Sequence, residues 1–331
     1  MSPRFTLRRI GAAVAAAAMT VTIAACGNSS DKAAAPAGDG KPETTALTIG
    51  FTPVADQGAL IIAVNKGYFT DEGLTVTPRA AQGGAAAVPA MVAGELQGVF
   101  GTYPSFLLAQ QNATEMRIVG LGVSGSENFA GVFVNPKSGI TSIKDLAGKK
   151  LAVNTLNNTG DLTIKSVLRE NGVDPAQVNF MELPFPDMAG ALERGTVDAV
   201  WAVEPFQSNL LAAGNKKLFS NFSGRTATIP LAGVAMTADF VKKNPNTTAA
   251  FARALERANA ELAKDPNSVR AVVPTYSKTT AEVANKMQLP TWHEGYPTVE
   301  GLQLWNTVMV DEGALQKPVD LSKMVYAPPA K

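Results

Sequence analysis

Polar residues gather in this sequence at the ends of short apolar segments that have the composition of β-strands. Their hydroxyl, amide and carboxylate groups are suited to hold one small ligand by hydrogen bonds. The candidate ligand-binding residues are Thr52, Asp56, Gln57, Gly83, Gly84, Thr102, Tyr103, Asn128, Phe129, Asn154, Thr155, Thr159, Gly160 and Glu204. None of these is a lysine or an arginine, so we expect neutral donors and helix N-termini to hold any anionic group. The carboxylates Asp56 and Glu204 favour a ligand that also carries a donor such as an amino group.

Several of these positions also have a structural interpretation. A tight turn accounts for residues 83–84, and helix capping accounts for Asp56 and Thr159. Tyr103 fits a cleft wall that does not touch the ligand. Glu204 fits a pair with a lysine or a backbone N–H outside the site. The sequence leaves both interpretations open.

Composition excludes several kinds of site. The chain has 331 residues, of which 46% are hydrophobic and 17% charged, with a formal net charge of +1. One cysteine, Cys26, excludes a disulfide framework, and one histidine, His293, disfavours a zinc site or a Ser-His-Asp triad. We therefore expect no metal ion and no cofactor, and we assign His293, Trp201 and Trp292 to packing or surface positions. The near-neutral charge gives no reason to expect a nucleic acid.

The N-terminus has the pattern of a bacterial lipoprotein signal. A basic region with three arginines precedes the uncharged residues 10–23, which are too few to span a bilayer as a helix. The Ile-Ala-Ala before Cys26 resembles a lipobox, in which the cysteine is lipidated. We predict a lipoprotein signal peptide over residues 1–25 and a flexible tether over residues 26–46. An ordinary secretory cleavage site and a twin-arginine signal are the alternatives.

Two stretches about a hundred residues apart share the order strand, helix, strand, helix, strand. They cover residues 47–101 and 150–202. This order is typical of a parallel sheet covered by helices, in which ligands bind beyond the carboxyl ends of the strands. We predict that the second helix of the first stretch begins near Val88, because the following proline then lies in its first turn. Asn246 is a candidate cap for a helix over residues 247–264.

Four segments together resemble one family of proteins. They are GYFTDEGLTV followed by AQGG (67–84), GITSIKDLAGKKLAV (139–153), MAGALERGTVDAVWAVEPF (188–206) and EGLQLWNTVMVDEGALQKPVD (300–320). In order and spacing they are similar to the periplasmic substrate-binding proteins of ABC importers for nitrate, sulfonates and taurine. That family also includes thiamine-pyrimidine binders. The resemblance covers residues 47–320 and departs at Gln97, where the family often has an acid that matches Asp198.

The resemblance implies an α/β, two-lobe fold of the periplasmic-binding-protein type (type II), with the ligand cleft between the lobes. Each lobe is expected to be a mostly parallel sheet covered by helices. Lobe 1 is expected to combine residues 47–134 with residues 230–331, and lobe 2 to cover residues 135–229. The two crossings between the lobes are then expected near residues 132–135 and 229–234.

The implied function is that of an extracytoplasmic solute-binding lipoprotein that delivers a small polar solute to an ABC transporter permease. We favour a sulfonate or taurine-like solute, with a thiamine-pyrimidine-type heterocycle as the alternative. The expected partners are the solute, the permease and, through a lipid on Cys26, the cell membrane. The expected state is a monomer without enzymatic activity.

An enzyme on the same fold is the hypothesis from another class. Some eukaryotic relatives make the thiamine pyrimidine from their own histidine, which implies a site histidine and a cysteine-rich iron motif. This chain contains one histidine, His293, and one cysteine, Cys26, which are too few for such a site and motif. A surface lipoprotein that senses or adheres is a third hypothesis.

Overall fold

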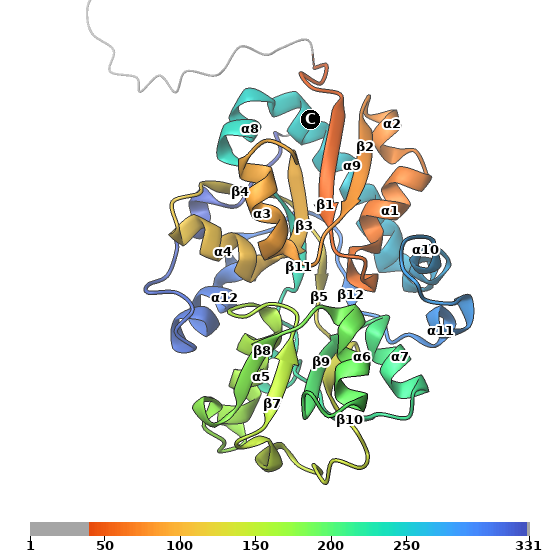
Figure 1. Cartoon of the computed structure of the whole chain (residues 1–331). Helices are drawn as coiled ribbons and strands as arrows, with labels where there is room; N and C mark the ends of the chain where they lie inside the picture. The colour runs from red at the N-terminus through yellow and green to blue at the C-terminus, as the bar shows by residue number, and fades with distance from the viewer. Residues whose placement is uncertain (1–39, 330–331) are drawn as a thin grey trace, which may run out of the picture. The chain divides into compact units, whose positions relative to one another are not determined.

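The computed structural model describes residues 40–329, whose helices and strands are drawn in Figure 1. The predicted signal peptide, Cys26 and most of the predicted tether lie outside these residues. The described chain contains two five-stranded sheets and one two-stranded sheet. Helices pack against the large sheets, so the predicted α/β class is confirmed.

The first sheet follows from the first repeated stretch. Its strands are β1 (Ala46–Phe51), β2 (Thr75–Ala80), β3 (Gly98–Thr102), β4 (Met116–Leu121) and β11 (Ala232–Thr237). Their order is β2-β1-β3-β11-β4. β11 is antiparallel to both of its neighbours, so the other four strands share one direction. The carboxyl ends of β1 and β3 therefore lie at the same edge of the sheet.

The second sheet has the same arrangement. Its strands are β6 (Ala130–Val134), β7 (Lys150–Val153), β8 (Asn179–Glu182), β9 (Ala199–Val203) and β10 (Lys216–Phe219). Their order is β10-β6-β9-β7-β8, and this order read from β8 to β10 matches the order of the first sheet read from β2 to β4. β7 corresponds to β1, β9 to β3, and the antiparallel β6 to β11. The repeat seen in the sequence is thus a repeat of sheet topology.

The chain passes between the two sheets earlier than expected. The crossing expected near residues 132–135 overlaps β6, which pairs with β9 and β10 inside the second sheet. Every residue of β6 is buried, as is typical of a central strand covered on both faces. The passage takes place over residues 122–129, and the return takes place over residues 220–231, ahead of β11.

Helices cover both sheets (Figure 1). They are α1 (Gly58–Asn65), α2 (Tyr68–Asp71), α3 (Gly84–Val92), α4 (Tyr103–Gln111), α5 (Thr159–Glu170), α6 (Phe185–Glu193), α7 (Phe206–Ala212), α8 (Ala238–Lys243), α9 (Pro245–Lys264), α10 (Val269–Tyr276), α11 (Ala281–Lys286) and α12 (Val299–Asp311). The two-stranded sheet pairs β5 (Val123–Ser124) with β12 (Thr291–Trp292). Helix α12 contacts both α4 and α5, so the C-terminal part of the chain touches helices of both sheets.

Helix α3 begins four residues before the predicted start. It runs from Gly84 to Val92 with Pro89 in its interior, so the expected start near Val88 is wrong. A proline inside a helix removes one hydrogen bond, here to the carbonyl of Ala85. Pro89 is exposed, and α3 therefore accommodates it at the surface. The earlier start brings the N-terminus of α3 to the end of the loop that contains Gly83.

Helix α9 is capped by a residue far away in the sequence. Asn246 lies inside its first turn, so the expected capping role of Asn246 is wrong. The carboxylate of Glu43 accepts hydrogen bonds from the backbone N–H groups of Asn246 at 3.1 Å and Thr247 at 2.9 Å. An anionic acceptor at this position also suits the helix dipole.

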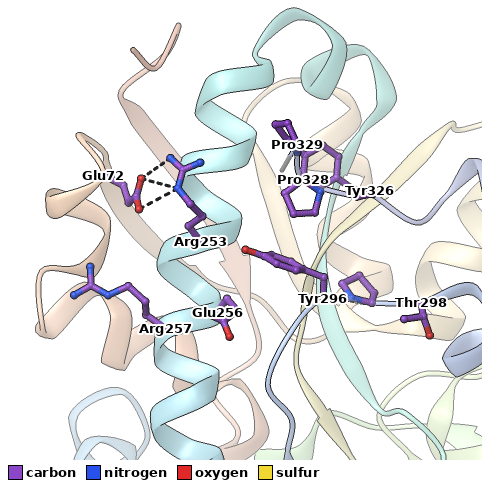
Figure 2. A pocket seen from close by; sticks show the side chains of 11 residues that line it. Glu72, Arg253, Glu256, Arg257, Tyr296, Thr298, Tyr326, Pro328 and Pro329 are labelled. Carbon is purple, nitrogen blue, oxygen red and sulfur yellow. Dashed lines mark hydrogen bonds and ion pairs between the residues drawn. The ribbon is translucent and has the colours of Figure 1, made fainter. Parts of the chain in front are cut away.

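Helix α9 is joined to α2 by an ion pair and an aromatic contact. Arg253 Nε donates to both carboxylate oxygens of Glu72, at 3.1 and 3.0 Å (Figure 2). Phe251 stacks on Phe69 with ring centroids 5.0 Å apart. These contacts fix α9 against the helices that cover the first sheet.

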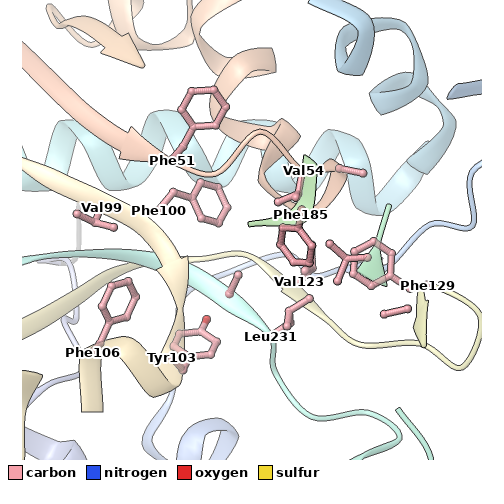
Figure 3. Packing of buried hydrophobic residues seen from close by; sticks show 14 of the residues in the cluster. Phe51, Val54, Val99, Phe100, Tyr103, Phe106, Val123, Phe129, Phe185 and Leu231 are labelled. Carbon is pink, nitrogen blue, oxygen red and sulfur yellow. The ribbon is translucent and has the colours of Figure 1, made fainter. Parts of the chain in front are cut away.

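The apolar core is continuous from one sheet to the other. Figure 3 shows part of it, with Phe51 and Phe100 from the first sheet and Phe129 and Phe185 from segments beside the second sheet. All four side chains are buried. Burial of apolar surface contributes roughly 25 cal/mol per Å² to stability, so this shared core holds the two halves of the structure, each a five-stranded sheet with its helices, near each other.

Candidate functional site

A small cavity lies where the carboxyl ends of β1, β3, β7 and β9 meet. Its volume is about 30 Å³. The residues that line it are Thr52, Val54, Asp56, Gln57, Gly83, Gly84, Thr102, Asn154, Thr155, Asn158, Phe185, Trp201, Val203 and Leu231. The structure therefore brings together eight of the candidate residues, namely Thr52, Asp56, Gln57, Gly83, Gly84, Thr102, Asn154 and Thr155. We call this cavity the polar cavity.

Hydrogen bonds cross directly from the first sheet to the second beside the polar cavity. Thr102 Oγ1 donates to Asn158 Oδ1 at 2.6 Å, and Asn158 Nδ2 donates to Ser105 Oγ at 2.9 Å. The backbone N–H of Ala55 donates to the carbonyl of Glu204 at 2.9 Å. By the usual measure of about 10–15 Å³ for a water molecule, the enclosed space holds only a few small atoms. The two halves are thus closed on each other in this structure.

Two helices, α3 and α5, have their N-termini at the polar cavity. Gly83 is the N-cap of α3, and Asn158 is the N-cap of α5, where its side chain accepts from the N–H of Thr159 at 2.8 Å. The first N–H groups of a helix have no partner inside the helix, and the helix dipole favours negative charge there. The site can therefore attract oxyanion oxygens without a lysine or arginine in its lining.

Gly83 stands against the opposite half of the structure. A Cβ at this position would lie 3.3 Å from Asn154 Nδ2 and 3.3 Å from Thr155 Oγ1. At Gly84 a Cβ would lie 3.1 Å from the Cα of Gly101 on β3. The two glycines thus let α3 approach both β3 and the loop after β7, which is a stronger constraint than a tight turn alone.

Asp56 is the ionisable residue among those that line the polar cavity. Its side chain is buried, and burial raises the pKa of Asp56 to about 7. Both protonation states are therefore populated near neutral pH. The protonated carboxyl can donate to an oxyanion, and the ionised carboxylate can accept from an amino group. Beside it, Gln57 Oε1 accepts from the N–H of Thr52 at 2.7 Å, which fixes the loop after β1.

Two residues that line the polar cavity, Trp201 and Asn158, are not among the candidates from the sequence. The expectation that Trp201 is a packing residue is incomplete, because Trp201 lines the polar cavity and its buried indole N–H donates to no acceptor among the described residues. A buried donor without a partner costs free energy, so its position in a ligand cavity is informative. Gly160 packs on the Trp201 ring, where a Cβ would lie 2.5 Å from a ring carbon. The position of Trp201 near the end of a predicted strand was the available signal.

Three further candidates lie outside the lining of the polar cavity. Tyr103 is fully buried, and its hydroxyl lies next to the position of a Cβ on Gly233. Phe129 is buried and stacked on Phe222, with ring centroids 6.4 Å apart. Asn128 is exposed. Burial and core packing account for the first two side chains.

The candidates Thr159 and Gly160 are the first two residues of α5; both are buried, and neither lines the polar cavity. Thr159 is the first residue of the helix and Asn158 is its cap, so the alternative interpretation of Thr159 as the helix cap is wrong. The hydroxyl of Thr159 is buried without a partner among the described residues.

The carboxylate of Glu204 is used inside the protein. Its Oε1 accepts from Gln207 Nε2 at 2.8 Å, from Ser208 Oγ at 3.0 Å and from the backbone N–H of Gln288 at 3.0 Å. Burial raises the pKa of Glu204, while these hydrogen bonds lower it. Glu204 thus pairs with neutral donors outside the lining of the polar cavity, and the backbone N–H of Gln288 is the kind of partner that the structural interpretation of Glu204 expects.

Other cavities and polar groups in the described chain are weaker candidates for a ligand site. The groove of Figure 2, about 720 Å³ in volume, is lined by Arg253 and Glu72, which are already paired with each other. His293 Nε2 lies 2.8 Å from Ser124 Oγ, at the two-stranded sheet. Within residues 40–329 no cluster of three potential metal ligands occurs, and no helix is long and apolar enough to cross a membrane.

Curated relatives match the chain over part of their length. The nitrate/nitrite binding protein NrtA of Synechococcus elongatus is 29% identical over 259 residues, which cover 67% of this chain and 56% of that protein. The taurine-binding periplasmic protein of Escherichia coli is 27% identical over 209 residues, which cover 62% of this chain and 63% of that protein. The chain thus matches little more than half the length of these relatives.

Solved structures share the fold at low identity. The periplasmic nitrate-binding protein NrtA from Synechocystis has a TM-score of 0.75 at 18% identity, with 86% of this chain and 87% of that chain covered. The fold also occurs in the desulfurization enzyme DSZB, which has a TM-score of 0.64 at 16% identity, with 85% of this chain and 96% of that chain covered. The predicted periplasmic-binding-protein-like fold is therefore confirmed. The family model described as NMT1/THI5 like matches residues 55–269, and the chain accordingly belongs to the NMT1/THI5-like family.

Proposed function

We propose that this chain is the solute-binding component of an ABC importer, and that it captures a small oxyanion, a sulfonate or taurine-like solute, for delivery to a permease. The observation that supports this most is the polar cavity itself. It is formed by equivalent strand ends of two equivalent sheets, and hydrogen bonds close it from both sides. Such a site encloses a ligand when two lobes close about a hinge.

The two sheets with their helices serve as the two lobes in this proposal. We place the lobe boundaries at the crossings over residues 122–129 and 220–231, in place of the expected boundaries near residues 134 and 229. A hinge requires a few residues that absorb a change in dihedral angles, and these two connecting segments are the ones that join the sheets. Binding would then shift the population toward the closed form.

The lining chemistry favours an oxygen-rich head group. Donors come from hydroxyls, amides and two helix N-termini, and the indole N–H of Trp201 adds one more. Asp56 alone offers a carboxylate to an amino group of the ligand, because Glu204 is paired elsewhere. A protonated Asp56 suits a simple sulfonate, and an ionised Asp56 suits the amino group of taurine.

We propose that Cys26 is lipidated, that the mature protein is anchored outside the cytoplasm, and that it acts as a monomer without catalysing a reaction. The nitrate- and taurine-binding relatives support a binding role. Two or three acyl chains give stable membrane anchoring, since one chain alone binds only marginally.

Titration calorimetry on the purified chain at pH 6 and pH 8 tests the solute class. The panel is methanesulfonate, taurine, nitrate and hydroxymethylpyrimidine. We expect methanesulfonate to bind more tightly at pH 6, because protonation of Asp56 removes a negative charge and supplies a donor. Tighter taurine binding at pH 8 than at pH 6 would assign the ionised carboxylate to the amino group. Binding of nitrate alone or of the pyrimidine alone would refute the proposed solute class.

A further inference from the structure

We propose that a second cavity beside the polar cavity binds an aromatic group attached to the same ligand. Its wall is formed by the rings of Phe185, Phe206 and Tyr276, and we call it the aromatic cavity. The inference rests on the proposed function, because it assigns the polar cavity to an oxyanion head. It narrows the solute class from small sulfonates to sulfonates that carry an aromatic ring.

The aromatic cavity adjoins the polar cavity. Thr52 and Phe185 line both of them, so the two cavities share part of their walls. A ligand that places its head among the donors of the polar cavity can therefore extend its other end past Phe185. Both cavities lie between segments of the first sheet and segments of the second sheet.

A row of aromatic rings connects the two cavities. Trp201 lines the polar cavity, and its ring centroid lies 5.5 Å from that of Phe185. Phe185 in turn stacks on Phe206 with centroids 5.2 Å apart and planes at 15°. Phe206 lines the aromatic cavity. Stacked and tilted rings at such distances are the arrangements in which aromatic groups attract one another, so the row can be extended by a ligand ring.

The opposite wall is also aromatic and is fixed in place. Tyr276 Oη donates to the carbonyl of Val54 at 3.1 Å, and its ring meets that of Phe51 edge-on at 5.7 Å. Val54 itself lines the polar cavity. The hydroxyl of Tyr276 is thus used by the protein, which leaves its ring as the surface for a ligand.

The size and polarity of the aromatic cavity suit a ring. Its volume is about 380 Å³, whereas a cavity of about 150 Å³ already binds benzene. Prolines and alanines supply much of the remaining lining, and Lys278, which is exposed, is the charged residue there. A solute as small as nitrate or methanesulfonate would leave this apolar space unused.

Calorimetry with methanesulfonate and benzenesulfonate separates the two parts of the ligand. We expect the wild-type chain to bind benzenesulfonate at least tenfold more tightly than methanesulfonate. Phe206→Ala should remove most of this difference and change methanesulfonate affinity by less than twofold, because Phe206 lines only the aromatic cavity. Phe240→Ala, a change of another partly buried phenylalanine outside both cavities, is the matched control and should retain the difference.

The outcomes distinguish this inference from the proposed function. Equal affinities of the two sulfonates for the wild type, or an equal loss for both in Phe206→Ala, would overturn the aromatic cavity and leave the importer role standing. Failure of both sulfonates to bind would overturn the oxyanion head and the inference with it. If Phe206→Ala lowers the melting temperature, Phe206→Leu keeps an apolar side chain there, and we expect it to remove part of the difference.

Discussion

Thr102 Oγ1 donates a 2.6 Å hydrogen bond to Asn158 Oδ1, and this bond joins the end of β3 to the N-terminus of α5. Asn158 has two roles at once, because its Oδ1 also accepts from the N–H of Thr159 at the start of α5. Its Nδ2 donates to Ser105 Oγ on the first-sheet side. One side chain therefore caps a helix of one half and holds the other half against it.

The first prediction concerns this bond across the cavity. Thr102→Val keeps the shape of the side chain and removes its donor. We expect affinity for methanesulfonate to fall about three- to tenfold, because a neutral hydrogen bond contributes about 0.5–1.5 kcal/mol. Calorimetry measures the affinity, and small-angle scattering of the ligand-free chain should show a larger radius of gyration. Thr307→Val, on the exposed face of α12, is the control and should change neither quantity.

The second prediction concerns the unpaired indole N–H of Trp201. Trp201→Phe keeps an aromatic ring and removes the donor, and we expect methanesulfonate affinity to fall about tenfold. A hydrogen bond to a charged group contributes about 1.5–3 kcal/mol. Relaxation of the site around the smaller phenyl ring offsets part of this loss in binding free energy.

Trp292 provides a matched control for Trp201. Its indole N–H is likewise buried without a partner among the described residues, but it does not line the polar cavity. Trp292→Phe should leave the affinity unchanged. An equal loss in both variants would show that the effect comes from packing and not from the ligand.

The third prediction concerns the pH dependence of stability at Asp56. In the folded chain the pKa of Asp56 is about 7, against an ordinary value of 3.8, so between these pH values the native state holds a proton that the unfolded state releases. The raised pKa costs nothing below about pH 4, and the cost grows with pH until it is complete above pH 7. Three pKa units correspond to at most about 4 kcal/mol.

Asp56→Asn removes this cost because the amide does not ionise. We therefore expect the free energy of unfolding to increase by up to a few kcal/mol at pH 8 and to change by less than about 1 kcal/mol at pH 4. Urea titrations at the two pH values measure the difference. A gain of the same size at both pH values would contradict the titration of Asp56 as its cause.

The fourth prediction concerns Glu204. Glu204→Ala leaves the donors of Gln207, Ser208 and Gln288 without their acceptor, and we expect a loss of about 1–3 kcal/mol in the free energy of unfolding. Urea denaturation measures it. Glu95→Ala removes an exposed ion pair and should cost less than about 1 kcal/mol. Similar losses in the two variants would show that the buried network contributes little.

The sequence predicted where polar groups follow strands, and this was enough to find most of the polar cavity. The carboxyl ends of parallel strands meet at one edge whatever the details of packing, so Thr52, Thr102 and Asn154 could be placed from local pattern alone. Side-chain direction is not local. Glu204 follows a strand in the same way, but its carboxylate accepts hydrogen bonds from the nearby Gln207 and from Gln288, which lies more than eighty residues later in the chain.

The same limit explains the residues that the sequence did not reveal. Trp201 reads as a core residue because it lies in a buried strand, and only the tertiary structure shows that its N–H lacks an acceptor. Asn158 reads as an ordinary cap until β3 is placed opposite it. The resemblance places a crossing at residues 132–135, and the three-strand repeat does not include this segment. The strand β6 pairs with β9 and β10, which come much later in the sequence, so only the tertiary structure shows that it belongs to the second sheet.

The insertion of β11 between β3 and β4 has a consequence for the order in which the chain can fold. During synthesis β3 and β4 emerge more than a hundred residues before the strand that separates them. Until residue 237 has been made, both strands expose backbone donors and acceptors that will later pair with β11. The second sheet has all of its strands by residue 219 and can form first. The first sheet is thus completed by a strand that is synthesised after the whole second sheet. Fragments that stop before residue 232 retain an open first sheet, which is prone to wrong pairing.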